Sequence, residues 1–133
     1  VTKPKVVISP HDEAFSRLDK LKEQKLWQNG RVKEYHTELT DIIRIYIEKM
    51  FNIGSMEMTS DEILNNVRFM KSDKSGAYEA LRQMLSLADL VKFAKWNPSP
   101  SDNELSMMNA YLFVNQTKIE EVKPLDNTVK PQQ

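Results

Sequence analysis

The sequence predicts an all-α fold, a compact bundle of about five amphipathic helices. Apolar residues recur at intervals of three and four along most of the chain, whereas the strict alternation that indicates strands is rare. Helix-capping and helix-stopping residues divide the chain into segments of helix length. The 133 residues form one domain, which is long enough to bury a stable core without disulfides.

The first helix is predicted from Pro10 to Gln28. Ser9 is a good N-cap, proline suits the first helical position, and Asn29-Gly30 supplies the stop because glycine accepts the left-handed conformation. The second helix, from Arg31 to Phe51, carries the clearest buried stripe. Its members are Val32, Tyr35, Leu39, Ile42, Ile43, Tyr46 and Met50. The short gap between the first and second helices leaves two alternatives, a tight helical hairpin or a long helix kinked near Gly30.

A capping box opens the third helix, predicted from Ser60 to Met70 after an extended connector at residues 55–58. The Thr59 hydroxyl can accept an amide hydrogen bond three residues on, and the Glu62 carboxylate can reach back. The inward residues are expected to be Ile63, Leu64, Val67 and Met70.

The fourth helix is predicted from Ala77 to Ala88, with Lys95 as an alternative end. Its core side comprises Tyr78, Leu81, Leu85, Ala88 and Val91. The run Ser99-Pro100-Ser101-Asp102 repeats the cap of the first helix and starts a fifth helix, predicted from Pro100 to Val122. That helix is expected to bury Leu105, Met108, Leu112 and Ile119, with Tyr111 alongside.

Three segments follow from these boundaries. Residues 9–122 form the helical bundle domain. Residues 1–8 contain Lys3 and Lys5 and are predicted to be a disordered, juxtamembrane-like segment. Residues 123–133 are Pro-rich and polar, which predicts a disordered tail. No stretch reaches the roughly 18 consecutive apolar residues that a membrane-spanning helix needs.

The composition argues against several function classes. Nineteen basic residues balance nineteen acidic ones, so the basic excess typical of nucleic-acid-binding proteins is absent. The chain has no cysteine, and its two histidines, His11 and His36, lie in different predicted helices without a zinc-binding pattern. The run Asp73-Lys74-Ser75-Gly76 resembles the start of a calcium loop, but Met84 occupies the position of the acidic ligand that closes it. No enzyme activity, cofactor or metal centre is therefore expected.

One surface is predicted to bind a protein partner. Near the end of the fourth helix, Asp89, Lys92 and Trp96 would share a side if the helix continued, with Lys95 close by. Tryptophan beside lysines is typical of a recognition patch. The alternative is structural: Trp96 would cover the bundle end, and the lysines would favour the helix C-terminus.

A different class of function also fits the pattern. The third and fourth helices could form a loose helix-turn-helix that binds nucleic acid. Its phosphate contacts would be Arg68, Lys71, Lys74 and Arg82. The six-residue turn between the helices is longer than the usual three or four, and Glu79 and the zero net charge count against this alternative.

Several runs resemble a known family in order and spacing. They are Tyr35–Glu48 (YHTELTDIIRIYIE), Phe51-Asn52-Ile53, Met56–Leu64 (MEMTSDEIL) and Ala88–Ala94 (ADLVKFA). Together they resemble the cytoplasmic helical region of Bacteroidetes membrane proteins that belong to the aerotolerance (Bat-type) gene cluster. The resemblance covers roughly residues 15–117. One departure is His36, which stands where the family pattern has a second tyrosine.

The resemblance implies a setting rather than an activity. Members of that family carry a membrane helix just before this region, and their neighbours are a MoxR-type AAA+ ATPase and von Willebrand A-domain proteins. The chain is thus expected to be a non-catalytic adaptor domain on the cytoplasmic side of the inner membrane, docking such partners through the surface at Asp89, Lys92, Lys95 and Trp96.

Overall fold

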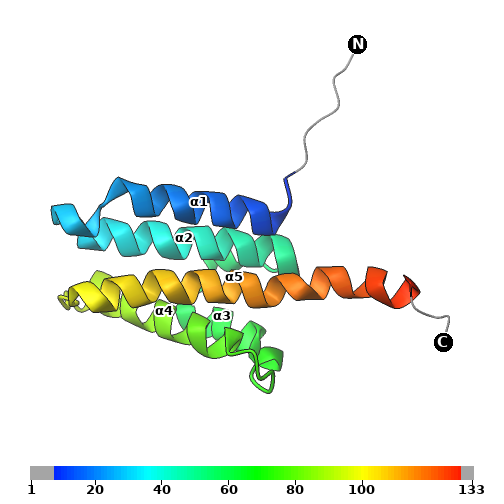
Figure 1. Cartoon of the computed structure of the whole chain (residues 1–133). Coiled ribbons are helices and arrows are strands. Elements are labelled where there is room, and N and C mark those ends of the chain that lie inside the picture. The colour runs from blue at the N-terminus through cyan, green and yellow to red at the C-terminus, as the bar shows by residue number, and fades with distance from the viewer. Residues whose placement is uncertain (1–7, 130–133) are drawn as a thin grey trace, which may run out of the picture.

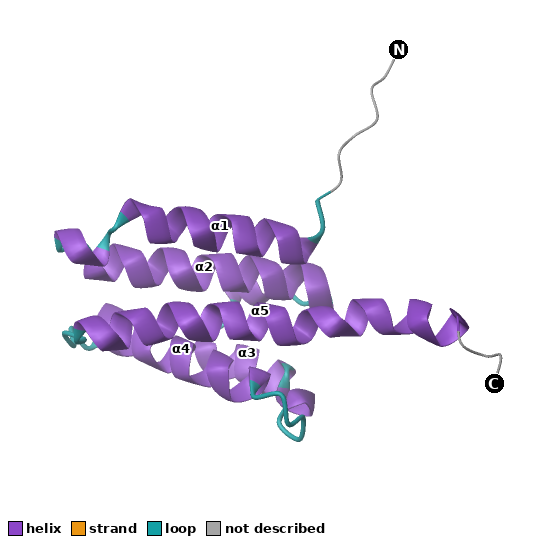
Figure 2. Cartoon of the chain, viewed as in Figure 1, coloured by secondary structure: helices purple, strands orange, loops and turns teal. Residues whose placement is uncertain are grey.

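The computed structural model describes residues 8–129, and every regular element within them is a helix (Figure 2). The predicted all-α fold class is confirmed. The elements are α1 (Pro10–Gln24), α2 (Val32–Phe51), α3 (Ser60–Asn66), α4 (Ala77–Phe93) and α5 (Pro100–Val129), with short 3-10 turns at η1 (Trp27–Asn29), η2 (Ser55–Glu57) and η3 (Arg68–Met70).

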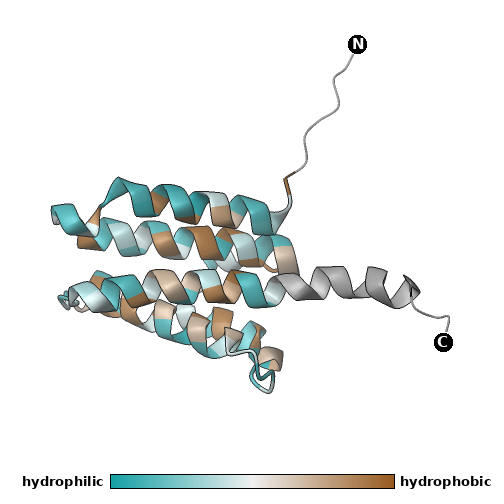
Figure 3. Ribbon diagram, viewed as in Figure 1, coloured by the Kyte–Doolittle hydropathy of each residue, from teal (hydrophilic) through white to brown (hydrophobic). Residues whose placement is uncertain are grey.

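The four long helices form a bundle whose members alternate in direction (Figure 1). Each packs against two neighbours, in the order α1, α2, α4, α5 around the bundle, and the short α3 packs on α4. The ends of α1 and α4 and the starts of α2 and α5 therefore lie at the same end of the molecule. Figure 3 shows hydrophobic and hydrophilic residues on the same helices, as expected of amphipathic elements. At the centre the rings of Tyr46 and Phe113 meet edge to face, 5.9 Å apart.

The first two helices form a hairpin, and the alternative of a long kinked helix is wrong. Gly30 adopts the expected left-handed conformation, with φ 82°. However, α1 ends at Gln24 rather than at Gln28, because Lys25 is itself left-handed, with φ 53°. In an unbroken helix Leu26 would point about 140° away from Leu21 and leave the core side. The turn at Lys25 instead buries Leu26, which is 4% exposed.

The connector before α3 is a 3-10 turn, not the extended segment predicted. The Arg44 side chain on α2 donates hydrogen bonds to the carbonyl oxygens of Ser55 (3.1 Å) and Met58 (2.5 Å), and the Ser55 hydroxyl donates to the Arg44 carbonyl (2.6 Å). These bonds fold the connector back onto α2.

The predicted capping box of α3 is confirmed. The Thr59 hydroxyl accepts from the Glu62 amide (3.1 Å), and the Glu62 carboxylate accepts from the Thr59 amide (2.9 Å). The α-helix ends at Asn66, earlier than predicted, because Val67 departs from helical geometry with φ −108° and ψ 21°. The turn η3 then brings Met70 into the core, where it is 6% exposed.

The fourth helix runs to Phe93, between the two ends considered, and four of its five predicted core residues are buried, with Tyr78 half-buried. The predicted cap of α5 is also confirmed. The Ser99 hydroxyl accepts from the Asp102 amide (3.1 Å), and the Asp102 carboxylate accepts from the Ser99 amide (3.0 Å).

The buried face of α5 is not the one predicted. Leu105, Met108 and Leu112 are 46%, 65% and 38% exposed. The inward face comprises Asn103, Ser106, Met107, Ala110, Phe113, Val114 and Thr117. Two of its polar members have hydrogen-bond partners in the core: the Thr117 hydroxyl lies 2.5 Å from the Tyr46 hydroxyl, and Asn103 pairs with α2 as described below. The hydrogen-bonding groups of these two polar residues are therefore satisfied inside the bundle.

The last helix is longer than predicted. The helix α5 continues to Val129, past the predicted end at Val122, so residues 123–129 of the predicted disordered tail are helical. The side chain of Ile119, predicted to be buried, lies outside the described residues, as do the predicted juxtamembrane segment at residues 1–7 and the last four residues of the tail.

Candidate functional site

The predicted interaction surface lies where α4 ends. The amides of Ala94 and Trp96 both donate to the carbonyl oxygen of Leu90, at 3.1 and 3.0 Å. This closure requires a left-handed residue, and Lys95 supplies it with φ 56°. Because the chain turns at Lys95, Trp96 does not continue the helical face on which Asp89 and Lys92 lie.

The four predicted residues are thus gathered at one end of one helix rather than along one face. Asp89 and Lys92 are one turn apart on α4 and half-buried, whereas Lys95 is exposed in the closing turn. The Trp96 side chain is 44% exposed, so part of it packs on the protein and part of it is open to solvent.

Two apolar residues of this surface were missed by the sequence interpretation. Phe93 is 76% exposed and Leu90 is 46% exposed. The Lys92 ammonium lies 5.6 Å from the centre of the Phe93 ring, within the range of a cation–π contact. The sequence could have indicated that both residues are exposed, because neither lies on the stripe of core positions along α4. We call this surface the α4 end patch; its members are Asp89, Leu90, Lys92, Phe93, Lys95 and Trp96.

A buried polar cluster lies between α2 and the start of α5. The Tyr35 hydroxyl donates to the carbonyl oxygen of Asn103 (2.9 Å), and His36 Nε2 donates to the Asn103 side-chain oxygen (2.7 Å). The His36 ring is fully buried, and its Nδ1 atom has no hydrogen-bond partner. Burial lowers the pKa of His36, the Asn103 hydrogen bond opposes this shift, and the positive charge of Lys92 adds to it. Lys92 therefore links the α4 end patch electrostatically to this cluster.

The same cluster holds its tyrosine neutral. Burial raises the pKa of Tyr35, and the negative charge of Glu104 raises it further. Tyr35 and His36 are both inaccessible, with 3% and 0% exposure. Inside the bundle, Tyr35 satisfies the backbone carbonyl of Asn103 and His36 satisfies its side-chain oxygen.

A hollow of about 360 Å³ lies between the end of α1 and α5. Its floor is formed by the buried residues Leu21, Tyr35 and Met107, and its walls include Trp27 and Met108. The pattern gave no sign of this hollow, because Met108 was assigned to the core. We call it the Trp27 hollow.

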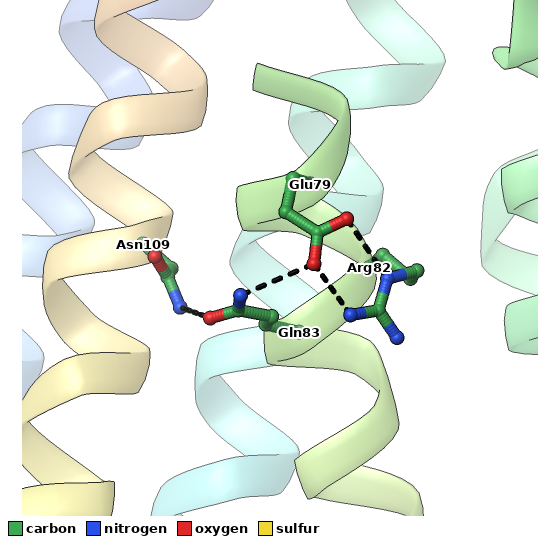
Figure 4. A network of polar contacts seen from close by, with 4 residues as sticks. All are labelled: Glu79, Arg82, Gln83 and Asn109. Carbon is green, nitrogen blue, oxygen red and sulfur yellow. Dashed lines mark hydrogen bonds and ion pairs between the residues drawn. The ribbon is translucent and has the colours of Figure 1, made fainter. Parts of the chain in front are cut away.

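All four residues of the helix-turn-helix alternative are exposed, and one of them, Arg82, is held by a neighbouring carboxylate. The Arg82 guanidinium is paired with the Glu79 carboxylate on the same helix, with nitrogen-to-oxygen distances of 3.0 and 2.5 Å (Figure 4). Hydrogen bonds from Arg82 and Gln83 lower the pKa of Glu79 to about 2, so this carboxylate is charged at neutral pH. The Lys71 ammonium lies 5.6 Å from the centre of the Tyr78 ring.

Gln83 also links α4 to α5, because its side-chain oxygen accepts a hydrogen bond from the side-chain amide of Asn109 (3.3 Å; Figure 4). This hydrogen bond connects the side of α4 that carries Gln83 to α5.

Among the residues that the structure describes, no group of three or more His, Asp or Glu side chains is placed to hold a metal ion. Nor does any helix in that part of the chain combine the length and the apolar content needed to cross a membrane. Comparisons with protein-family models, with curated proteins and with solved structures find no match. The resemblance to the Bat-associated membrane proteins therefore stays a prediction.

Proposed function

We propose that this bundle is a non-catalytic adaptor domain that binds a protein partner through the α4 end patch. The observation that carries the proposal is the exposure of Phe93 at 76%, together with the partly exposed Leu90 and Trp96. Large apolar side chains gathered on a surface mark binding sites, and aromatic residues are enriched at the centres of protein interfaces.

The local geometry supports a preformed site. Trp96 is fixed by its backbone hydrogen bond to Leu90, and α4 is held between α2 and α5. A partner would therefore meet aromatic side chains on a rigid support, which reduces the entropy lost on binding. Lys92 and Lys95 outnumber Asp89, so the partner surface is expected to be acidic around an apolar centre.

The resemblance indicates which partners and which cellular location to test. A MoxR-type ATPase and von Willebrand A-domain proteins are the proteins to test. In this proposal the domain follows a membrane helix and works at the cytoplasmic side of the inner membrane.

The test is binding of the purified domain to each purified candidate by calorimetry. The double variant Lys92→Glu/Trp96→Ala is expected to lose binding while its circular dichroism spectrum stays unchanged. Phe69→Ala/Lys71→Glu is the matched control, because Phe69 is also exposed, at 65%, and the change in charge is the same. The control is expected to bind like the unmodified domain.

Two results would contradict the proposal. One is equal binding by the Lys92→Glu/Trp96→Ala variant and the unmodified domain, which would remove the α4 end patch from consideration. The other is equal loss of binding in both double variants, which would mean that the changes act through the fold. Capture from fractionated cells with mild crosslinking, in which proteins held by the unmodified domain but not by the α4 end variant are identified, extends the test to partners outside this pair.

A further inference from the structure

The Trp27 hollow is continuous with a row of exposed apolar residues along α5. Met108 forms part of the wall of the hollow, and Leu105 and Leu112 lie three and four residues from it, on the same side of the helix. The three side chains are 46%, 65% and 38% exposed. They span about two helical turns, or roughly 10 Å.

The shape of this surface fits a helix better than a small molecule. The volume of about 360 Å³ is at the low end of the range for small-molecule pockets, which runs from about 300 to 1,000 Å³. The hollow is not enclosed, and the apolar row extends beyond its lining, since Leu105 and Leu112 are exposed outside it. A partner helix can place one large apolar side chain in the hollow and lay further ones, at intervals of three and four residues, on Leu105 and Leu112.

The charges around the hollow favour an acidic partner. Lys22 borders it from α1 and Lys25 from the turn that follows α1, and both are exposed. Glu104 borders it from α5, so the edge carries two positive charges and one negative charge. The Lys22 ammonium lies 5.6 Å from the centre of the Tyr111 ring and is held on the α5 side of α1. A helix with carboxylates on the flank that faces α1 would meet these lysines.

We propose that the Trp27 hollow, together with the apolar row at Leu105, Met108 and Leu112, is a second docking site, which binds an acidic amphipathic helix of a partner protein. The site shares no residue with the α4 end patch. It does not depend on the function proposed above, and either site can fail its test while the other stands.

The lining of the hollow allows a direct test with the full chain. The chain has two tryptophans, so a Trp96→Phe background leaves Trp27 as the only fluorescent tryptophan. The probe is a synthetic peptide helix of about five turns with leucines at intervals of three and four residues and glutamates elsewhere. Its counterpart carries lysine at every glutamate position. Titration of each peptide into the Trp96→Phe protein measures binding through Trp27 emission.

The acidic peptide is expected to change the Trp27 emission with saturation, and the lysine peptide is expected to bind at least roughly tenfold more weakly. Met108→Gln in the same background should weaken the acidic peptide by roughly tenfold, because it removes the apolar wall without adding charge. Lys22→Glu/Lys25→Glu should reverse the preference between the peptides. Phe93→Ala, in the α4 end patch, is the control and should leave the affinity unchanged.

Several results would overturn this second site. They are no emission change with the acidic peptide at millimolar concentration, equal affinity for both peptides, or full affinity in the Met108→Gln variant. Met108 is 65% exposed, so the variant is expected to fold, and an unchanged melting temperature will verify this. Loss of affinity in Phe93→Ala would assign the peptide to the α4 end patch instead.

Discussion

Met107 and Met108 are adjacent, chemically identical residues with opposite surroundings, which makes them a sensitive test of the orientation of α5. Met107 is 6% exposed and belongs to the core, whereas Met108 is 65% exposed. The sequence interpretation placed Met108 inside. We expect Met107→Ala to destabilise the protein by about 2–3 kcal/mol, the lower part of the range for removal of a buried methionine side chain. We expect a value in the lower part of this free-energy range because Met107 also borders the Trp27 hollow. Solvent from the hollow can reach part of the cavity that the substitution leaves.

Met108→Ala is expected to change the free energy of unfolding by no more than about 0.5 kcal/mol, as is usual for a surface substitution. Alanine has a slightly higher helix propensity than methionine, but this gain is the same at both positions and cancels in the comparison. The difference between the variants should therefore be about 2 kcal/mol, or roughly 8 °C in melting temperature for a domain of this size.

The assay is urea unfolding followed by far-ultraviolet circular dichroism, with the m-value compared among the three proteins so that a change in midpoint reports stability. Equal destabilisation by the two substitutions, or a larger effect at Met108, would refute the assigned orientation of α5. It would also remove the second docking site, which needs Met108 to be exposed.

Three further predictions concern the rest of the molecule. Because burial lowers the pKa of His36 from 6.5 in the unfolded chain, its contribution to stability is complete above that pH and is lost as the pH falls below it. Urea unfolding from about pH 7.5 to pH 5 should show this loss in the unmodified protein, and the free energy of unfolding should change less with pH in His36→Gln. An equal change with pH in both proteins would contradict this prediction. Thr59→Ala should lower the free energy of unfolding by about 1 kcal/mol, because the backbone amide of Glu62 loses its acceptor. The control Thr37→Ala on α2 should lower it less. Equal melting temperatures of Thr59→Ala and the unmodified protein would count against the capping box. A mobility-shift assay with duplex DNA at low salt should show no complex, since Glu79 neutralises Arg82 and the net charge is zero; a complex that weakens with added salt would support the helix-turn-helix alternative instead.

Local signals in the sequence were sufficient to find most helix starts. Ser9, Thr59 and Ser99 each precede a helix, and each hydroxyl accepts the expected backbone hydrogen bond. Such caps depend on residues three apart in the chain, so they form with little help from the rest of the fold. The core stripe of α2 was equally accessible, because most of its apolar residues lie on one broad face.

The ends of α1 and α4 depended on packing instead. Lys25 and Lys95 adopt the left-handed conformation without being glycine or asparagine. That conformation costs an ordinary residue roughly 1 kcal/mol, so nothing in the local sequence favours it. At Lys25 the cost is offset because Leu26 becomes buried, a contact that exists only once α1 and α2 have met. The arrangement of the α4 end patch follows from the corresponding turn at Lys95.

The sequence by itself determined that the chain is an all-α bundle and where its capped helices begin, because periodicity and capping are properties of neighbouring residues. Only the tertiary structure decided which face of α5 is buried. That helix has two apolar sides, one with Leu105, Met108 and Leu112 and one with Met107, Phe113 and Val114. The second side is buried because its polar residues, Asn103 and Thr117, find partners in His36 and Tyr46, more than sixty residues away along the chain. The first side is left at the surface, where it forms the apolar row beside the Trp27 hollow.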